Sequence, residues 1–307
     1  MPGEEKIVIG AIGDERILAK LNLSALNSVE KVIPILKPYK LSNREFRKES
    51  SIVEVAGVKF GGKNIPLIAG PCAVESEEQI LDAAIGVKEA GASMLRGGAY
   101  KPRTSPYAFQ GLEVEGLELL KLAREKTGLP IVTEVVSEKD VDIVAQYADM
   151  FQIGARNMQN FRLLQAVGES KVPTLLKRGA AASMQEFLMA AEYILARGNQ
   201  NVILCERGIK SFFTETRNTF DLSIIPLLKQ ETHLPVIADP SHATGIRSIV
   251  PDMSLAAIAA GADGLIIEVH PNPEVALSDG FQQLTIGDYA DLIGRARSVA
   301  NAVNRSI

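Results

Sequence analysis

The chain has 307 residues, of which 46% are apolar and 23% charged, and its formal net charge is −4. Such a chain buries a large core and is too apolar to be disordered. The negative charge excludes an overall basic surface for nucleic acid, and no apolar run approaches the roughly 18 residues of a membrane helix. We therefore expect a soluble globular protein whose partners include neither nucleic acid nor a membrane.

Residues 1–50 form the first predicted unit, in which the segment "EKIVIGAIGDERILAKLNLSALNSVEKVIPILKPYKLSNREF" reads as strand, helix, strand. The start "MPGEEKIVIG" is acidic where a signal peptide is basic, and it lacks the apolar region of such a peptide, so we expect a cytoplasmic protein. A strand with an unpaired edge favours pairing with another subunit. This unit is therefore a candidate oligomer contact, and we expect a homo-oligomer, either a dimer or a tetramer.

Residues 51–307 form the second predicted unit, which begins with an expected hairpin, "SIVEVAGVKFGG". From about Ile65 onward, short apolar runs alternate with helical patterns. The eight runs are "IPLIAG", "SMLRG", "PIVTE", "MFQIG", "PTLLK", "VILCER", "PVIAD" and "GLIIEV". Because these runs do not alternate with polar residues, they indicate strands buried on both faces, as in a parallel sheet covered by helices.

The segments between the runs are typical of helices, for example residues 76–91, 183–198 and 254–262. Ser76, Ser183 and Ser254 are the expected caps at the helix starts, and glycines follow the ends. Eight such βα units predict a closed (β/α)₈ TIM barrel, with an open doubly wound sheet as the alternative.

In a (β/α)₈ barrel the active site lies at the carboxyl ends of the strands. Each of the eight runs ends at a polar, charged or thiol residue: Cys72 after Gly70-Pro71, then Arg96, Glu134, Gln152, Lys177, Glu206-Arg207, Asp239 and Glu268. Just beyond them lie Lys101, Arg103, Arg156, Arg178 and His242. One charged residue at a strand end often does no more than reach solvent, but eight on one rim favour a functional mouth.

We expect six cations among these residues to come from different strands and to converge on one mouth: Arg96, Lys101, Arg103, Arg156, Lys177 and Arg207. Arginine forks match phosphate and carboxylate oxygens, and lysine adds a mobile point charge. Gly154 and Ala155 in "QIGARN" offer backbone N–H groups to an anion. The pattern predicts a small substrate with more than one phosphate or carboxylate group.

A second group of rim residues could bind a metal ion: Cys72, His242, Glu268 and Asp279. The first three follow strands one, seven and eight, and strands one and eight are neighbours in a closed barrel. Thiolate, imidazole and carboxylate together suit Zn²⁺, Fe²⁺ or Mn²⁺. Asp279 in "LSDG" is also compatible with a plain Asp-Gly turn, His270 with a structural role, and Cys205 with the core.

The motifs "IAGPCAVES", "LRGGAYKPRTSPYAFQG", "QIGARNMQNF", "LLKRG", "ILCERG", "ADPSHATG", "IIEVHPNP" and "LSDG" resemble those of the 3-deoxy-D-arabino-heptulosonate 7-phosphate (DAHP) synthases, the first enzymes of the shikimate pathway. The resemblance covers residues 65–280 and includes the (β/α)₈ fold. The same branch contains the 3-deoxy-D-manno-octulosonate 8-phosphate synthases, which have an "ANRS"-type segment where this chain has "KPRTS".

The resemblance implies condensation of phosphoenolpyruvate with erythrose 4-phosphate and water, giving the seven-carbon sugar phosphate and inorganic phosphate. It assigns phosphoenolpyruvate to Arg96, Lys101, Gly154, Ala155, Arg156, Lys177 and Arg207. It assigns erythrose 4-phosphate to Lys101, Pro102, Arg103, Thr104 and Asp239. It assigns a divalent ion, either Mn²⁺, Zn²⁺, Fe²⁺ or Co²⁺, to Cys72, His242, Glu268 and Asp279.

The catalytic residues expected from this reaction are Cys72, His242, Lys101 and Glu134. The metal, or water on it, polarises the aldehyde, and Lys101 stabilises or protonates the alkoxide formed there. Glu134, or a metal-activated water, takes the proton of the water that adds at C2. Two alternatives stay open: an octulosonate synthase that uses arabinose 5-phosphate, and an aldolase that forms a Schiff base at Lys177, whose pKa the neighbouring cations would lower.

The N-terminal unit resembles the second half of the ferredoxin-like domain that precedes some members of this family. In those members the domain mediates feedback inhibition by aromatic amino acids. The first half of the domain has no counterpart here, so we expect residues 1–50 to be either a remnant regulatory domain or an oligomer contact.

Overall fold

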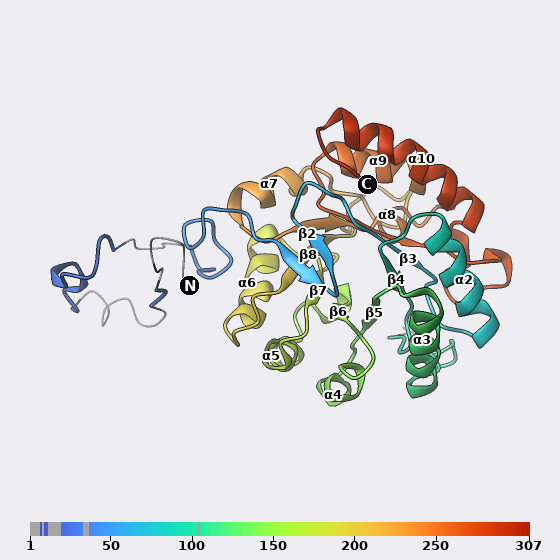
Figure 1. Ribbon diagram of the computed structural model, residues 1–307, viewed down its shortest axis with the longest axis horizontal. Helices are drawn as coiled ribbons and strands as arrows, with labels where there is room; N and C mark the ends of the chain where they lie inside the picture. The colour runs from blue at the N-terminus through green and yellow to red at the C-terminus, as the bar shows by residue number, and fades with distance from the viewer. Residues whose placement is uncertain (1–6, 8, 12–19, 33–36, 103–104) are drawn as a thin grey trace.

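Eight parallel strands close into a barrel, which confirms the expected fold (Figure 1). The computed structural model describes residues 7, 9–11, 20–32, 37–102 and 105–307. The barrel strands are β3 Leu67–Gly70, β4 Met94–Arg96, β5 Ile131–Glu134, β6 Met150–Ile153, β7 Thr174–Lys177, β8 Val202–Glu206, β9 Val236–Ala238 and β10 Leu265–Glu268. They pair in chain order, and β10 closes the ring on β3. All eight apolar runs are therefore strands of one sheet.

Helices cover the outside of the barrel (Figure 1). They are α2 Glu77–Glu89, α3 Val114–Thr127, α4 Val141–Val144, α5 Phe161–Ser170, α6 Met184–Leu195, α7 Ile224–Glu231, α8 Pro240–Thr244, α9 Val250–Ala259 and α10 Ile286–Ala302. Short 3₁₀ helices are η1 Leu23–Ala25, η2 Glu138–Asp140, η3 Ala155–Asn157, η4 Arg247–Ile249, η5 Pro273–Val275 and η6 Gly280–Gln282. No helix in the described ranges is long and apolar enough to cross a membrane.

The expected helix caps are confirmed at two of three serines. Ser76 accepts a hydrogen bond from the backbone of Gln79, and Ser183 forms a reciprocal capping box with Glu186. Ser254 is not a cap, because α9 begins one turn earlier, and the Ser254 hydroxyl donates to the Val250 carbonyl at 2.7 Å. The reason is a proline in the first turn of α9, which favours a helix start at that place.

The expected hairpin is confirmed and fills the amino-terminal end of the barrel. Strands β1 Val53–Val55 and β2 Val58–Phe60 are antiparallel and joined by Ala56 and Gly57, both with positive φ. The inward side chains of the hairpin, Val53, Val55 and Phe60, pack against the apolar interior of the barrel. That interior consists of Ile68, Met94, Val132, Met150, Leu175, Ile203, Cys205, Ile237 and Ile266. Cys205 is thus a core residue, as expected.

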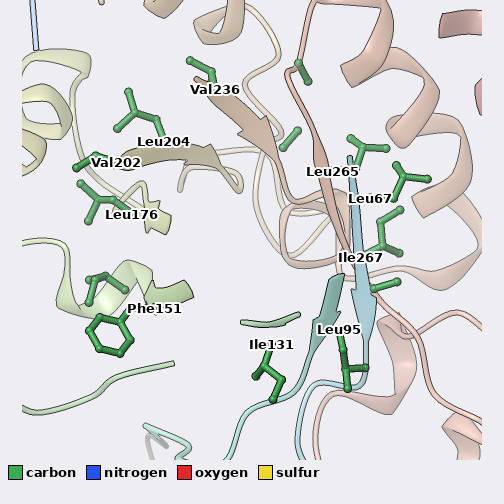
Figure 2. Close-up of a cluster of buried hydrophobic side chains, with 14 of the residues drawn as sticks. Leu67, Leu95, Ile131, Phe151, Leu176, Val202, Leu204, Val236, Leu265 and Ile267 are labelled. Carbon is green, nitrogen blue, oxygen red and sulfur yellow. The ribbon is translucent and has the colours of Figure 1, made fainter. Parts of the chain in front are cut away.

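The other face of the strands packs against the helices. Figure 2 shows ten of these outward side chains, from all eight strands: Leu67, Leu95, Ile131, Phe151, Leu176, Val202, Leu204, Val236, Leu265 and Ile267. The barrel therefore has two apolar layers, one inside the ring of strands and one between the strands and the helices. Because each strand is buried on both faces, successive residues of its sequence are apolar.

Residues 37–51, which we call the strap, run along the barrel before the hairpin. Glu192 of α6 accepts hydrogen bonds from the backbone N–H groups of Lys40, Leu41 and Ser42 at 2.6–3.1 Å. The Thr232 hydroxyl donates to the Ser42 carbonyl. The strap is therefore attached to the barrel through its backbone. Of the segment 5–46, where we expect strand, helix and strand, residues 5, 6, 8, 12–19 and 33–36 lie outside the described residues.

Candidate active site

The inward positions at the carboxyl ends of the strands are polar and form one mouth. Because alternate residues of a strand face the same side, the position two residues beyond an interior apolar residue faces this mouth. The residues so placed are Arg96, Glu134, Gln152, Lys177, Arg207, Asp239 and Glu268. By the same alternation Arg178 and Glu206 face the helices, where NH1 of Arg178 lies 3.0 Å from Oε2 of Glu206. These two residues form a structural ion pair outside the mouth.

Three of the four residues expected to bind a metal lie together, and the fourth, His242, contacts one of them. Ligand atoms of Cys72, Glu268 and Asp279 lie within 4.8 Å of one another, and Nε2 of His242 lies 3.3 Å from Oε1 of Glu268. Cys72 and Glu268 meet because β3 pairs with β10, with Gly70 opposite Glu268. Asp279 reaches them from the loop before η6, where it has a left-handed backbone with φ 51°.

The donor atoms of this cluster fit a divalent ion. Oε1 of Glu268 is buried and accepts no hydrogen bond from the described residues, although NH2 of Arg96 lies 3.0 Å away. Burial raises the pKa of Glu268, but electrostatic interactions with His242 and Arg96 outweigh burial and hold the pKa at about 2. Burial and the Glu268 charge raise the pKa of Cys72 to about 11, so the thiol keeps its proton until a cation replaces it. An ionised carboxylate, an imidazole and a replaceable thiol proton form a mixed site for a borderline metal.

His242 is held in place by the short helix α8. Asp239 caps this helix by accepting a hydrogen bond from the His242 backbone N–H at 3.0 Å, and its Oδ2 lies 2.8 Å from Nδ1 of His242. Burial lowers the pKa of His242 more than the nearby carboxylates of Asp239 and Glu268 raise it. The imidazole is therefore neutral at pH 7, the form in which histidine binds metals.

Three cations surround the same cluster. NH1 of Arg96 is buried and donates no hydrogen bond to the described residues, which leaves it available to an anion. Within the described part of the chain, Arg207 donates hydrogen bonds of 3.4 Å to the carbonyls of Gly208 and His242. Nζ of Lys177 lies 2.6 Å from Oδ2 of Asp239, and both side chains of this ion pair are buried. Arg96 and Arg207 are thus the cations with the most unused donor capacity.

Lys101 connects the cations to the metal cluster. Its Nζ donates to the carbonyl of Cys72 at 2.8 Å and to Sγ of Cys72 at 3.2 Å. Burial lowers the pKa of Lys101, but electrostatic interactions with Cys72, Glu134 and Glu268 more than compensate and leave the pKa raised. The side chain therefore remains an ammonium group beside the cluster.

Glu134 and Gly154 lie against each other across neighbouring strands. Oε2 of Glu134 accepts a hydrogen bond from Gln152 at 3.2 Å. A Cβ atom on Gly154 would lie only 2.0 Å from Oε1 of Glu134, so no larger residue fits there without moving this carboxylate. Gly154 and Ala155 begin the 3₁₀ helix η3, and NH1 of Arg156 in that helix donates to the Pro102 carbonyl at 3.2 Å. Arg103 and Thr104 lie outside the described residues.

The sequence reasoning missed four residues that support this site: Arg217, Ser278, Gln282 and Gln283. Gln282 and Gln283 are buried and hydrogen-bonded to the elements that carry Cys72 and Glu268. Their one signal in the sequence is a polar pair directly before the apolar Leu284, close to Asp279.

The fold and the mouth define the class of protein: a (β/α)₈-barrel enzyme for small anionic substrates, with a cluster of side chains that could hold a metal ion among its cations. A family model described as "DAHP synthetase I family" matches residues 42–302, and one described as "DAHP synthase ferredoxin-like domain" matches residues 1–37. The chain belongs to the DAHP synthetase I family. The second match confirms the resemblance of the N-terminal residues to a ferredoxin-like domain.

Individual relatives agree with this family. A phospho-2-dehydro-3-deoxyheptonate aldolase of Thermotoga maritima is 50% identical over 98% of this chain and 89% of its own length. A 2-dehydro-3-deoxyphosphooctonate aldolase of Acidithiobacillus ferrooxidans is 33% identical over 74% of this chain and 86% of its own. The crystal structure of the Thermotoga maritima DAHP synthase is similar with a TM-score of 0.86, at 48% identity, over 92% of this chain and 82% of that one.

Proposed function

We propose that the chain catalyses the condensation of phosphoenolpyruvate with erythrose 4-phosphate and water to give 3-deoxy-D-arabino-heptulosonate 7-phosphate and phosphate. The relative that is 50% identical over nearly the whole chain carries the name of this activity. The observation that carries the proposal is the position of Arg96. This buried cation has an unused NH1 and lies 3.0 Å from Glu268 of the metal-binding cluster, so an anionic substrate and a metal would meet there.

The activity is proposed to depend on a divalent metal ion, Mn²⁺, Zn²⁺, Fe²⁺ or Co²⁺, held by Cys72, His242, Glu268 and Asp279. The closeness of three of these ligand atoms, and the distance of 3.3 Å between Oε1 of Glu268 and Nε2 of His242, support the assignment. When bound, such an ion would supply Lewis-acid stabilisation of negative charge on a carbonyl oxygen.

Phosphoenolpyruvate is assigned to the cations of the inner mouth. Its phosphate and carboxylate match Arg96, Arg207 and Lys101, the first two with unused donors. Lys177, Gly154, Ala155 and Arg156 complete the proposed site. The two anionic groups of this substrate account for so many cations in a chain with a negative net charge.

Lys101 and Glu134 are the proposed proton-handling residues. Lys101 remains charged beside Cys72, where it can donate a hydrogen bond to the alkoxide that forms when C3 of phosphoenolpyruvate attacks the aldehyde. Glu134 faces the mouth with Oε1 against Gly154, and we assign it to the proton of the water that adds at C2.

The second phosphate is assigned to the segment around Pro102, Arg103 and Thr104, together with Lys101. The bond from Arg156 to the Pro102 carbonyl supports this, because it ties the segment to the phosphoenolpyruvate side of the mouth. Asp239 is buried, and both of its oxygens are engaged by Lys177 and His242. We therefore propose that Asp239 acts on the acceptor sugar indirectly, by positioning those two side chains.

The two alternatives have weaker support. The relatives named for the octulosonate activity are about one-third identical to the chain, against 50% for the heptonate relative. A Schiff-base mechanism needs Nζ of Lys177 to attack a carbonyl carbon, whereas this atom is engaged by Oδ2 of Asp239 at 2.6 Å.

For the whole chain we keep the division into residues 1–50, a ferredoxin-like regulatory remnant or oligomer contact, and residues 51–307, the catalytic barrel with its hairpin. The family match over residues 1–37 supports the first unit. A homo-oligomer and a cytoplasmic location stay predictions.

The test follows the loss of phosphoenolpyruvate absorbance with erythrose 4-phosphate or arabinose 5-phosphate, with and without EDTA. We expect turnover with the four-carbon sugar, loss of turnover in EDTA, and its return on addition of a divalent ion. The variant Cys72→Ala should remain folded and inactive, whereas Cys205→Ala, the matched change in the core, should remain active. Preference for the five-carbon sugar would overturn the substrate assignment, and full activity of Cys72→Ala in EDTA would overturn the metal.

A further inference from the structure

Two consecutive glutamines, Gln282 and Gln283, lie at the end of η6 with no exposed surface. A buried amide costs free energy unless both its donor and its acceptor find partners. Both side chains here find them, and the partners belong to the metal-binding cluster or to the residues beside it. This use of two buried polar residues calls for an explanation beyond packing.

Gln282 holds the carboxylate of Glu268. Its Nε2 donates to Oε2 of Glu268 at 2.5 Å, which leaves Oε1 as the oxygen that faces the cluster. Its own Oε1 accepts a hydrogen bond from NH1 of Arg217 at 2.8 Å. The same NH1 lies 3.2 Å from Oδ2 of Asp279. Gln282 and Arg217 therefore join two candidate ligands, one on a strand and one on a loop.

Gln283 holds the other side of the cluster. Its Oε1 accepts a hydrogen bond from the Cys72 backbone N–H at 2.9 Å, and its Nε2 donates to the Ser278 carbonyl at 2.8 Å. Cys72 and Ser278 are 206 positions apart, and their side chains also meet, with Sγ 3.2 Å from Oγ. The amide thus fixes the loop that carries Asp279 against the segment that carries Cys72.

The glutamines are themselves held by the sheet. The next residue, Leu284, donates its backbone N–H to the Glu268 carbonyl and accepts from the His270 N–H, both at 2.9 Å. This bridge continues the register of β10 into the loop. The position of both amides is therefore set by backbone hydrogen bonds and does not depend on an ion.

We propose that Gln282 and Gln283 are positioning residues of the metal site, which hold Cys72, Glu268 and Asp279 at ligating distance before an ion arrives. The inference rests on the proposed metal dependence and adds to it the residues that set the affinity. Outer hydrogen bonds of this kind typically contribute about 10- to 100-fold to metal affinity.

The test measures metal binding in the absence of substrate. Co²⁺ is titrated into metal-free protein, and thiolate-to-cobalt charge-transfer absorption reports the bond to Cys72. We expect Gln282→Met and Gln283→Met each to weaken Co²⁺ binding about 10- to 100-fold. Gln283→Glu keeps the acceptor for the Cys72 N–H and loses the donor to Ser278, so its loss should be smaller than that of Gln283→Met. The exposed Gln185→Met is the matched control and should bind like the natural protein.

A second measurement separates positioning from general stability. Thermal unfolding in EDTA reports the fold alone, and at saturating Co²⁺ the kcat of the variants should return to within a few-fold of the natural value. Should Gln282→Met fail to fold, Arg217→Met on the partly exposed loop removes the same support from Gln282 and Asp279. Unchanged Co²⁺ affinity in the variants would overturn the inference. Absence of the charge-transfer absorption in the natural protein would instead overturn the proposed metal site.

Discussion

At the scale of single residues, the face of the strand to which a side chain points matters as much as the residue type. The chemistry at the strand ends could be read from the sequence, because polar residues follow apolar runs. The sequence does not show which of two neighbouring residues faces the mouth, and the pair Glu206 and Arg207 is an example. Successive strand residues point to opposite faces, so Arg207 faces the mouth while Glu206 pairs with Arg178 toward the helices. The interior layer of the barrel, formed once all strands close, decides between them.

Gly154 provides a prediction at this scale. In Gly154→Ala the new methyl group would lie 2.0 Å from Oε1 of Glu134 and would push this carboxylate from its place. If Glu134 moves the proton of the attacking water, kcat should fall about 100-fold, a typical loss for a general base. Steady-state kinetics of this variant, of Glu134→Gln and of the double variant measure the effect.

The double variant should be no slower than Glu134→Gln, because both changes remove the same group. Gly294→Ala is the control, since a Cβ on Gly294 meets nothing within 4 Å, and its kcat should not change. Additive losses in the double variant would mean that Gly154 acts through another residue.

At the scale of elements, the β1–β2 hairpin forms the floor of the barrel. Phe60 has no exposed surface and packs with Val53 and Val55 against the interior side chains of the strands. The hairpin could be predicted from its sequence, because two apolar runs flank a turn with glycine. Its place inside the barrel end could not, because its contacts are with strands as distant as β10.

Phe60→Ala should lower the free energy of unfolding by about 3–5 kcal/mol, the usual cost of removing a buried phenylalanine. Urea unfolding followed by circular dichroism measures this loss. The exposed neighbour in Lys59→Ala is the control and should change stability by less than about 0.5 kcal/mol. A comparably small loss for Phe60→Ala would show that the hairpin does not fill the barrel in solution.

At the scale of the whole molecule, the strap ties residues before the barrel to its base through His233. Nδ1 of His233 lies 2.7 Å from the Ser51 hydroxyl, and Nε2 lies 2.8 Å from the Leu41 carbonyl. A neutral ring that carries its proton on Nε2 satisfies both partners. Burial, assisted by the charges of Arg47 and Arg44, lowers the pKa of His233 despite the hydrogen bond to Leu41.

This lowered pKa predicts a pH dependence of stability. Below its ordinary value of 6.5, the unfolded chain binds a proton that the folded chain does not, so unfolding becomes easier as the pH falls. The contribution is complete above pH 6.5 and decreases below it, by at most about 1.4 kcal/mol per pH unit. Urea unfolding between pH 7.5 and 5 should show a shallower dependence for His233→Gln than for the natural protein. Equal slopes would contradict the prediction.

Part of the fold and of the candidate site could be predicted from the sequence. Eight apolar runs predicted the barrel, because a parallel sheet buried on both faces leaves a plain signal. Cys72 and Glu268 lie together because β3 pairs with β10, whereas Asp279 reaches them from the loop before η6. Gln282 and Gln283 could not be predicted, since Gln283 meets Cys72 only after the barrel closes. Helix α9 begins one turn before the expected cap, Ser254, because a proline in its first turn favours that start.

The hairpin that closes the base also makes the two ends of the barrel interior chemically different. Val53, Val55 and Phe60 leave the amino-terminal end apolar. The carboxyl ends of the strands instead carry buried charged groups, among them Arg96, Lys177 and Glu268. An anion that leaves water loses its hydration, and only the polar end offers groups that replace it. The two ends of the interior therefore differ in the free energy that an anion has there.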